Sequence, residues 1–152
     1  MSNVNVRSDA HVTAEALRAA PRTVDTHVGV VTARFGVLLQ TRVRARASGR
    51  PGPRRRTGDY RRGITTQTRR VIAGVWETTV GTNSPQGRRL ELGFIGADSL
   101  GRHYNQPPFP HFGPAVDQTE PEYAEALGAV VTALNQSGRA PVVTRDVSMG
   151  DG

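Results

Sequence analysis

The chain contains no cysteine among its 152 residues, which excludes disulfides, thiolate metal sites and cysteine nucleophiles. It also contains no lysine, so all twenty of its basic residues are arginine. Without lysine, the phosphate-binding P-loop pattern is impossible. A GC-rich genome is the simpler explanation of the arginine bias. Arginine nevertheless binds carboxylates and phosphates through a planar fork, so the bias also bears on binding.

Aromatic residues are scarce, at 5% of the chain, and Trp76 is the only tryptophan. This composition predicts a small core that is partly completed by neighbouring subunits. No apolar run approaches the ~18 residues of a membrane span, and the first twenty residues do not form an apolar signal segment. We therefore expect no membrane contact and one domain over residues 1–152. Within it we expect a flexible arm at 1–13, a core at 22–136 and a C-terminal strand or tail at 139–152.

Positive charge is concentrated in residues 42–70. Eleven of these 29 residues are arginine and Asp59 is their only acid, so the segment carries +10 in a chain of net charge +7. Such a segment needs open water, a polyanion or an acidic protein surface, because a buried unpaired charge costs many kcal/mol. It therefore predicts contact with nucleic acid or with an acidic partner. The simpler alternative is a solvated loop that only adds solubility.

Two segments have the apolar spacing of one helix face. In residues 22–47 the stripe is Val24, Val28, Val31, Phe35 and Leu38, with Gly29 and Gly36 expected to weaken the helix. In residues 120–136 the stripe is Tyr123, Leu127, Val130, Val131 and Leu134. Negative charge near the start of this second helix suits its dipole, and the acids there are Asp117, Glu120, Glu122 and Glu125. Shorter helices are expected at 14–20 and 85–92.

Residues 62–73 and 75–82 predict two strands joined at 73–74, with Trp76, Thr78 and Val80 on the core face. Residues 94–104 predict a hairpin or loop with short strands, and 140–149 a possible last strand. Residues 49–58 (GRPGPRRRTG) predict a mobile loop, and the proline-rich residues 106–114 an extended connector. The fold class is therefore α+β: two amphipathic helices packed on a small, mostly antiparallel sheet, with a long basic loop.

Catalytic patterns are weak. The histidines His11, His27, His103 and His111 have no metal-ligand spacing, and no G-x-S-x-G nucleophile motif occurs. The acids at 117–125 are explained better by helix-start electrostatics than by a bound divalent ion. We expect His103 and His111 to be structural or surface groups. The sequence therefore predicts a protein that is not an enzyme and has no cofactor or metal site.

Three segments resemble the neck or tail-completion family of long-tailed, siphovirus-type bacteriophages. The first is a long helix that leads into a Gly/Pro loop and then T-G-D-Y-R-R-G-I at 57–64. The second is V-G-T-N-S-P at 80–85 followed by R-L-E-L-G-F-I-G at 89–96. The third is Q-P-P-F-P-H-F-G-P-A-V at 106–116, a proline-rich entry to the last helix. Their order covers roughly residues 22–136.

The resemblance implies a structural virion protein at the head–tail junction, either a neck protein or a tail terminator. Such a protein assembles as a ring, expected to be a homohexamer, between the head-closure proteins and the tail tube protein. DNA passes through the lumen of the ring. The family's role implies assembly in the bacterial cytoplasm and a final location in the virion.

The charge asymmetry predicts a contact within this ring. An arginine-rich edge of one copy would meet the acidic start of the last helix in the next copy, Glu120, Glu122 and Glu125. The basic residues that face either this neighbour or DNA are Arg50, Arg54, Arg55, Arg56, Arg61 and Arg62. The alternative function is a small, non-specific nucleic-acid-binding protein that uses residues 42–70 as a clamp on the phosphate backbone.

Overall fold

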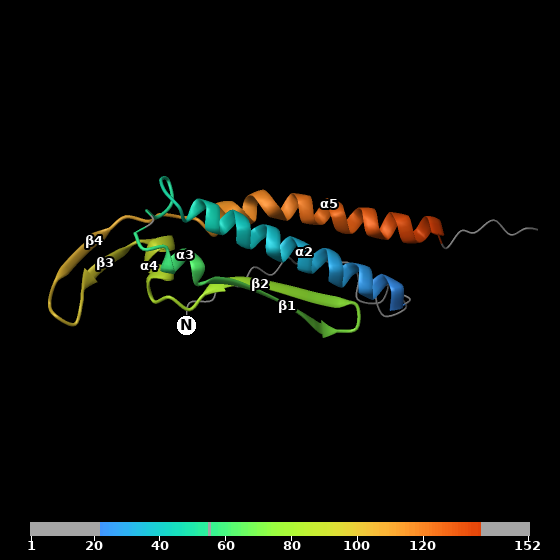
Figure 1. The fold of residues 1–152 in the computed structure, drawn as a ribbon, viewed down its shortest axis with the longest axis horizontal. Coiled ribbons are helices and arrows are strands. Elements are labelled where there is room, and N and C mark those ends of the chain that lie inside the picture. The colour runs from blue at the N-terminus through green and yellow to red at the C-terminus, as the bar shows by residue number, and fades with distance from the viewer. Residues whose placement is uncertain (1–21, 55, 138–152) are drawn as a thin grey trace, which may run out of the picture.

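The computed structural model describes residues 22–54 and 56–137. The expected arm at 1–13, the helix at 14–20 and the strand at 140–149 lie outside these residues. Helix α2 (Arg22–Arg46) runs through the middle of the molecule, and α5 (Gly113–Ser137) lies antiparallel along one side of it (Figure 1). A hairpin of β1 (Ile64–Ile72) and β2 (Val75–Thr82) covers another side of α2.

Two short helices lie at one end of the molecule, α3 (Asp59–Arg62) and α4 (Gln86–Leu92). A second hairpin, of β3 (Phe94–Ala97) and β4 (His103–Gln106), projects beyond them (Figure 1). The expected α+β class is confirmed. The strands form two separate two-stranded antiparallel hairpins in the described chain, rather than one sheet.

Helix α2 buries a line of residues next to the expected stripe. The buried positions on this line are Gly29, Thr32, Gly36, Leu39 and Val43. The expected stripe residues flank this line and are half-buried. A Cβ atom at Gly29 would lie 2.6 Å from the Trp76 ring, and one at Gly36 would lie 2.2 Å from the hydroxyl oxygen of Thr78. The two glycines, seven residues apart, therefore allow β2 to approach α2 closely.

The first hairpin pairs Ile64 with Thr82 at one end and Ile72 with Val75 at the turn. As expected, Trp76 is on the face toward α2, and Val80 on the same face is buried. Strand β1 begins at Ile64 rather than at residue 62, because residues 59–62 form α3.

The hydrophobic core is small and lies where the end of α2, the start of α5 and the base of the first hairpin meet. Its buried residues are Leu39, Val43, Ala47, Ile64, Val80, Phe112 and Ala115. Two of the seven are alanine, so the core contains few large side chains. This agrees with the low aromatic content of the chain.

Helix α5 begins at Gly113, seven residues before the expected start at 120, and contains Pro121 in its interior. The prediction that the acids crowd its first turn is wrong, since the first turn contains no acid. The early start is possible because Pro114 fits the first turn of a helix, where its missing N–H is not needed. The carboxylate of Glu91 on α4 accepts the backbone N–H groups of residues 111–113, at the start of the helix.

Candidate functional site

The arginines at the end of α2 bind other parts of the same chain. Both Glu122 oxygens accept hydrogen bonds from Arg42, at 2.8 and 2.9 Å, and the Thr119 hydroxyl accepts a third at 3.0 Å. Arg44 donates to the backbone carbonyl of Ile64 at 2.8 Å. These contacts join α2 to α5 and to β1, so this part of the basic segment serves the fold.

The loop at 49–58 is anchored at its middle. Gly52 and Pro53 are buried, and a Cβ atom at Gly52 would lie 2.0 Å from the carbonyl oxygen of Arg46. The guanidinium of Arg50 lies over the Phe109 ring, with its carbon 3.8 Å from the ring centroid, a cation–π contact. The loop is therefore held against the C-terminal end of α2 and the proline-rich connector.

Three of the expected site residues are not held by contacts within the described part of the chain. Arg54 and Arg56 are exposed, and Arg61 is half-buried. Within the described chain these three side chains have no hydrogen-bond or ion-pair partner. Arg55 is not among the described residues. Arg61 and Arg62 lie in α3, although the sequence predicted a strand from residue 62, and Arg62 forms an ion pair with Asp59.

The first hairpin holds the last two arginines of the segment. Arg69 pairs with Glu77 at 2.8 Å and Arg70 with Asp25 at 2.5 Å. Asp25 also accepts hydrogen bonds from the Trp76 indole, at 2.8 Å, and from a backbone N–H of the turn. The indole hydrogen bond is the largest influence that lowers the pKa of Asp25. Within the described residues, the basic segment is thus divided between arginines that have partners inside the chain and the unpaired Arg54, Arg56 and Arg61.

The acids expected to contact a neighbour are also divided. Glu120 and Glu125 are exposed on α5, while Glu122 is paired with Arg42 of its own chain. Helix α5 contains four acids and no basic residue. Its acids begin at Asp117, four residues after the first residue of the helix, and not at the helix start that the sequence predicts.

A buried cluster that the sequence reasoning missed joins α3, α4 and the start of α5. Oε2 of Glu91 accepts hydrogen bonds from the backbone N–H groups of His111, at 2.8 Å, and Phe112, at 3.1 Å. Its Oε1 accepts the N–H of Gly113 at 2.9 Å. Because the first N–H groups of a helix lack partners within the helix, Glu91 caps α5 from another element.

The tautomer of His111 follows from its neighbours. Nδ1 lies 2.9 Å from the carbonyl oxygen of Phe109 and 3.0 Å from Oε2 of Glu91, and both of these atoms only accept. Nδ1 therefore carries the hydrogen. In the neutral ring Nε2 is then an acceptor, and the Tyr60 hydroxyl donates to it at 2.7 Å.

Burial raises the pKa of the Glu91 carboxyl, but its hydrogen bonds with His111 and the backbone of α5 outweigh burial and lower that pKa to about 2. Burial, and secondarily the Glu91 charge, raise the pKa of Tyr60. The His111 side chain is 0% exposed, so no substrate reaches it in this conformation. The cluster resembles a proton relay in composition, but its position makes it a structural junction. His111 is buried at this junction and is not a surface group.

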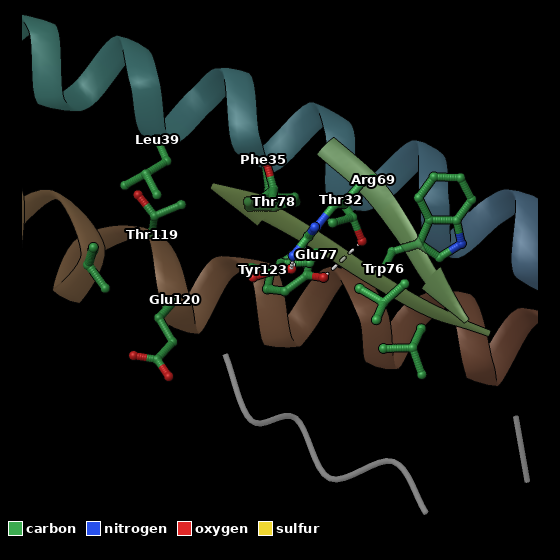
Figure 2. A pocket seen from close by; sticks show the side chains of 13 residues that line it. Thr32, Phe35, Leu39, Arg69, Trp76, Glu77, Thr78, Thr119, Glu120 and Tyr123 are labelled. Atoms are coloured by element: carbon green, nitrogen blue, oxygen red, sulfur yellow. Dashed lines mark hydrogen bonds and ion pairs between the residues drawn. The ribbon is translucent and has the colours of Figure 1, made fainter. Parts of the chain in front are cut away.

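An open apolar groove lies between the first hairpin and α5, with α2 as its floor (Figure 2). The groove has a volume of about 410 Å³. Inside it, the hydroxyls of Thr32 and Tyr123 are hydrogen-bonded at 2.9 Å, and the rings of Phe35 and Tyr123 are 5.3 Å apart. Glu120 lies at its edge (Figure 2). The only sequence signal for the groove is the apolar face expected for each long helix.

Comparison of the chain with protein-family profiles, with curated proteins and with solved structures finds no match in any of the three. Within residues 22–54 and 56–137, no helix combines the length and apolarity that crossing a membrane requires. The same residues contain no group of three potential ligand side chains placed to hold a metal ion.

Proposed function

We propose that this chain is a structural subunit of a ring at the head–tail junction of a long-tailed bacteriophage. The observation that carries the proposal is the distribution of apolar side chains. Nine large hydrophobic residues of the described chain are exposed, whereas seven apolar residues, two of them alanine, form the buried core. A subunit that leaves this much apolar surface in water is expected to cover it by association.

The Tyr60–His111–Glu91 cluster supports the family resemblance. Tyr60 belongs to the first resembling segment, Glu91 to the second and His111 to the third. The His111 side chain contacts both Tyr60 and Glu91, although fifty residues lie between Tyr60 and His111. The three segments that carry the resemblance therefore meet in one structural unit, as expected if they belong to one fold.

In this proposal the ring is a homohexamer that contacts the tail tube protein and the head-closure proteins, and DNA passes through its lumen. The protein acts by assembly rather than by catalysis and resides in the virion. Arg54 and Arg56 of one copy face Glu120 and Glu125 of the next. Glu122 contributes less, because Arg42 of its own chain already neutralises it.

The electrostatic contact is tested by charge reversal. Arg54→Glu with Arg56→Glu in one chain, and Glu120→Arg with Glu125→Arg in another, should each prevent ring formation, and mixing the two chains should restore it. Native mass spectrometry measures the oligomer in each case. Arg34→Glu, on an exposed part of α2, is the control and should leave rings intact. If each doubly reversed chain still forms rings alone, these side chains do not make the contact.

A second function, non-specific nucleic-acid binding, is favoured by the exposure of Arg54 and Arg56 on the loop. It predicts a monomer or dimer whose DNA affinity falls steeply with salt, with a logarithmic slope of about 0.9 per neutralised phosphate. The ring predicts discrete oligomers and weak DNA affinity. The mass of the purified chain in solution, with and without tail tubes, combined with a salt titration of DNA binding, separates the two functions.

A further inference from the structure

The second hairpin, β3–β4, is an isolated projection whose apolar side chains point into water. Ile95 on β3 is 82% exposed and Leu100 at the tip is 75% exposed. The two strands pair with each other, and neither strand packs extensively on another element (Figure 1). An exposed apolar hairpin of this kind is costly for a chain that works alone, because two-stranded hairpins are only marginally stable in water.

The tip of this hairpin is nevertheless rigid. The carboxylate of Asp98 accepts the backbone N–H groups of Leu100 and Arg102, at 2.9 and 3.0 Å. It also accepts the Arg102 guanidinium at 2.7 Å and the Tyr104 hydroxyl at 3.0 Å. Four donors on one carboxylate hold the loop in one conformation. Leu100 is therefore presented on a preorganised tip, which lowers the entropy lost on binding.

The groove between β1–β2 and α5 is the complementary feature. Val71 and Val75 line it beside the turn between β1 and β2, and this turn lies at the opposite end of the molecule from β3–β4 (Figure 1). Val71 and Val75 of the first hairpin and Phe35 of α2 are among its apolar residues. A projection at one end and a groove toward the other cannot meet within one chain of this elongated shape. They can meet between copies arranged head to tail, which is the geometry that closes a ring.

Charge favours the same pairing. The groove is bordered by α5, which has no base and places Glu120 on the groove. The other two charged residues of the lining, Arg69 and Glu77, are paired with each other. Residues 86–106, which include β3–β4, contain Arg88, Arg89 and Arg102 against two acids, Glu91 and Asp98, and Arg102 is paired with Asp98. Arg88 is exposed and has no partner among residues 22–54 and 56–137. A basic projection therefore faces an acidic border, which favours this arrangement over the reverse one.

We propose that Ile95 and Leu100 of the β3–β4 hairpin insert into the groove between β1–β2 and α5 of a second copy of this chain. This contact depends on the ring proposed above and would be the apolar part of the interface between its subunits. The basic loop at 49–58 lies toward the same end of the molecule as the hairpin (Figure 1). One copy can thus present both the hairpin and the loop to the next.

Cross-linking tests the contact directly, because the chain has no cysteine of its own. Leu100→Cys is mixed with Val71→Cys under mild oxidation, and a disulfide requires Cα atoms within about 7 Å. We expect a covalent dimer from the mixture and none from either variant alone. Leu100→Cys mixed with Val30→Cys, on the exposed side of α2, is the control. A doubly substituted chain, Leu100→Cys with Val71→Cys, should produce a ladder that ends at the ring.

Truncation measures the contribution of the two side chains. Ile95→Ala with Leu100→Ala should weaken self-association about a hundredfold, since two apolar side chains lose their contact. Val30→Ala with Val37→Ala removes comparable exposed apolar surface from α2. This pair should change the strength of self-association by no more than about twofold. Thermal unfolding of the dissociated chain should be the same for both pairs.

The outcomes are distinct. Rings that form without cross-linking above the Val30→Cys control overturn this contact and leave the ring intact. Val71→Cys chains that cross-link to one another show that the groove is a two-fold interface, which also overturns it. If Ile95→Ala with Leu100→Ala leaves ring formation unchanged, the hairpin does not fill the groove, and this contact is overturned. A small apolar ligand or another part of the same chain then covers the groove. A chain that remains monomeric with and without tail tubes overturns both the contact and the ring.

Discussion

The carboxylate of Glu91 on α4 accepts the backbone N–H of His111 at 2.8 Å, twenty residues away in the chain, at the point where α5 begins. The same carboxylate lies 3.0 Å from Nδ1 of the His111 ring. One side chain thus caps the helix and orients the histidine, whose other nitrogen accepts from Tyr60. The stability of this end of the molecule depends on these contacts.

Replacing Glu91 by alanine should lower the free energy of unfolding by about 3 kcal/mol, because three N–H groups at the start of α5 lose their acceptor. Glu91→Gln should cost less, since one amide oxygen still accepts. Chemical denaturation measures both. Glu125→Ala, at an exposed position of α5, is the control and should change the free energy of unfolding little. Equal losses for Glu91→Ala and Glu125→Ala would contradict the capping role.

Acid should weaken the fold through the same group. Because the pKa of Glu91 is lowered from 4.5 to about 2, the unfolded chain binds more protons than the folded chain between these values. Its contribution is present above about pH 4.5 and should be lost as the pH falls toward 2, by about 3 kcal/mol in total. Denaturation at several pH values should show a shallower acid dependence for Glu91→Gln. Parallel profiles for the two proteins would exclude Glu91 as the source.

Tyr60→Phe should destabilise the chain by about 1–3 kcal/mol, because the buried Nε2 of His111 loses its donor. Tyr104→Phe removes a hydroxyl that donates to Asp98 on the exposed hairpin and should have a much smaller effect. Thermal unfolding compares the two variants. A Tyr60→Phe protein as stable as Tyr104→Phe would show that Nε2 obtains another partner.

Gly36→Ala should lower stability by about 1–3 kcal/mol, because the new methyl group would lie 2.2 Å from the hydroxyl oxygen of Thr78. Gly128→Ala on α5 is the matched change, since no atom lies within 4 Å of the added methyl group. It should stabilise the helix by about 1 kcal/mol through helix propensity alone. If both substitutions stabilise the protein, then β2 does not pack against α2 as closely as the structure has it.

Much of the fold follows from local patterns. The helix at 22–46, the turn at 73–74 and the α+β class were predictable because each depends on spacing and turn residues within one segment. That α5 is a helix was predictable for the same reason. Its start was not, because Glu91, a residue far away in the chain, supplies the cap that lets the helix begin at Gly113.

The candidate site divides in the same way. By itself, the sequence determined that residues 42–70 are strongly basic, that the core is small and that no cysteine or lysine chemistry is available. Only the tertiary structure decided which arginines are paired within the chain, because Arg42, Arg69 and Arg70 meet acids from other elements. It also decided that Gly29 and Gly36 are contact points for β2. A periodicity rule identifies apolar side chains on a helix. The close approach of β2 to α2 depends instead on glycines, which have no side chain for such a rule to detect.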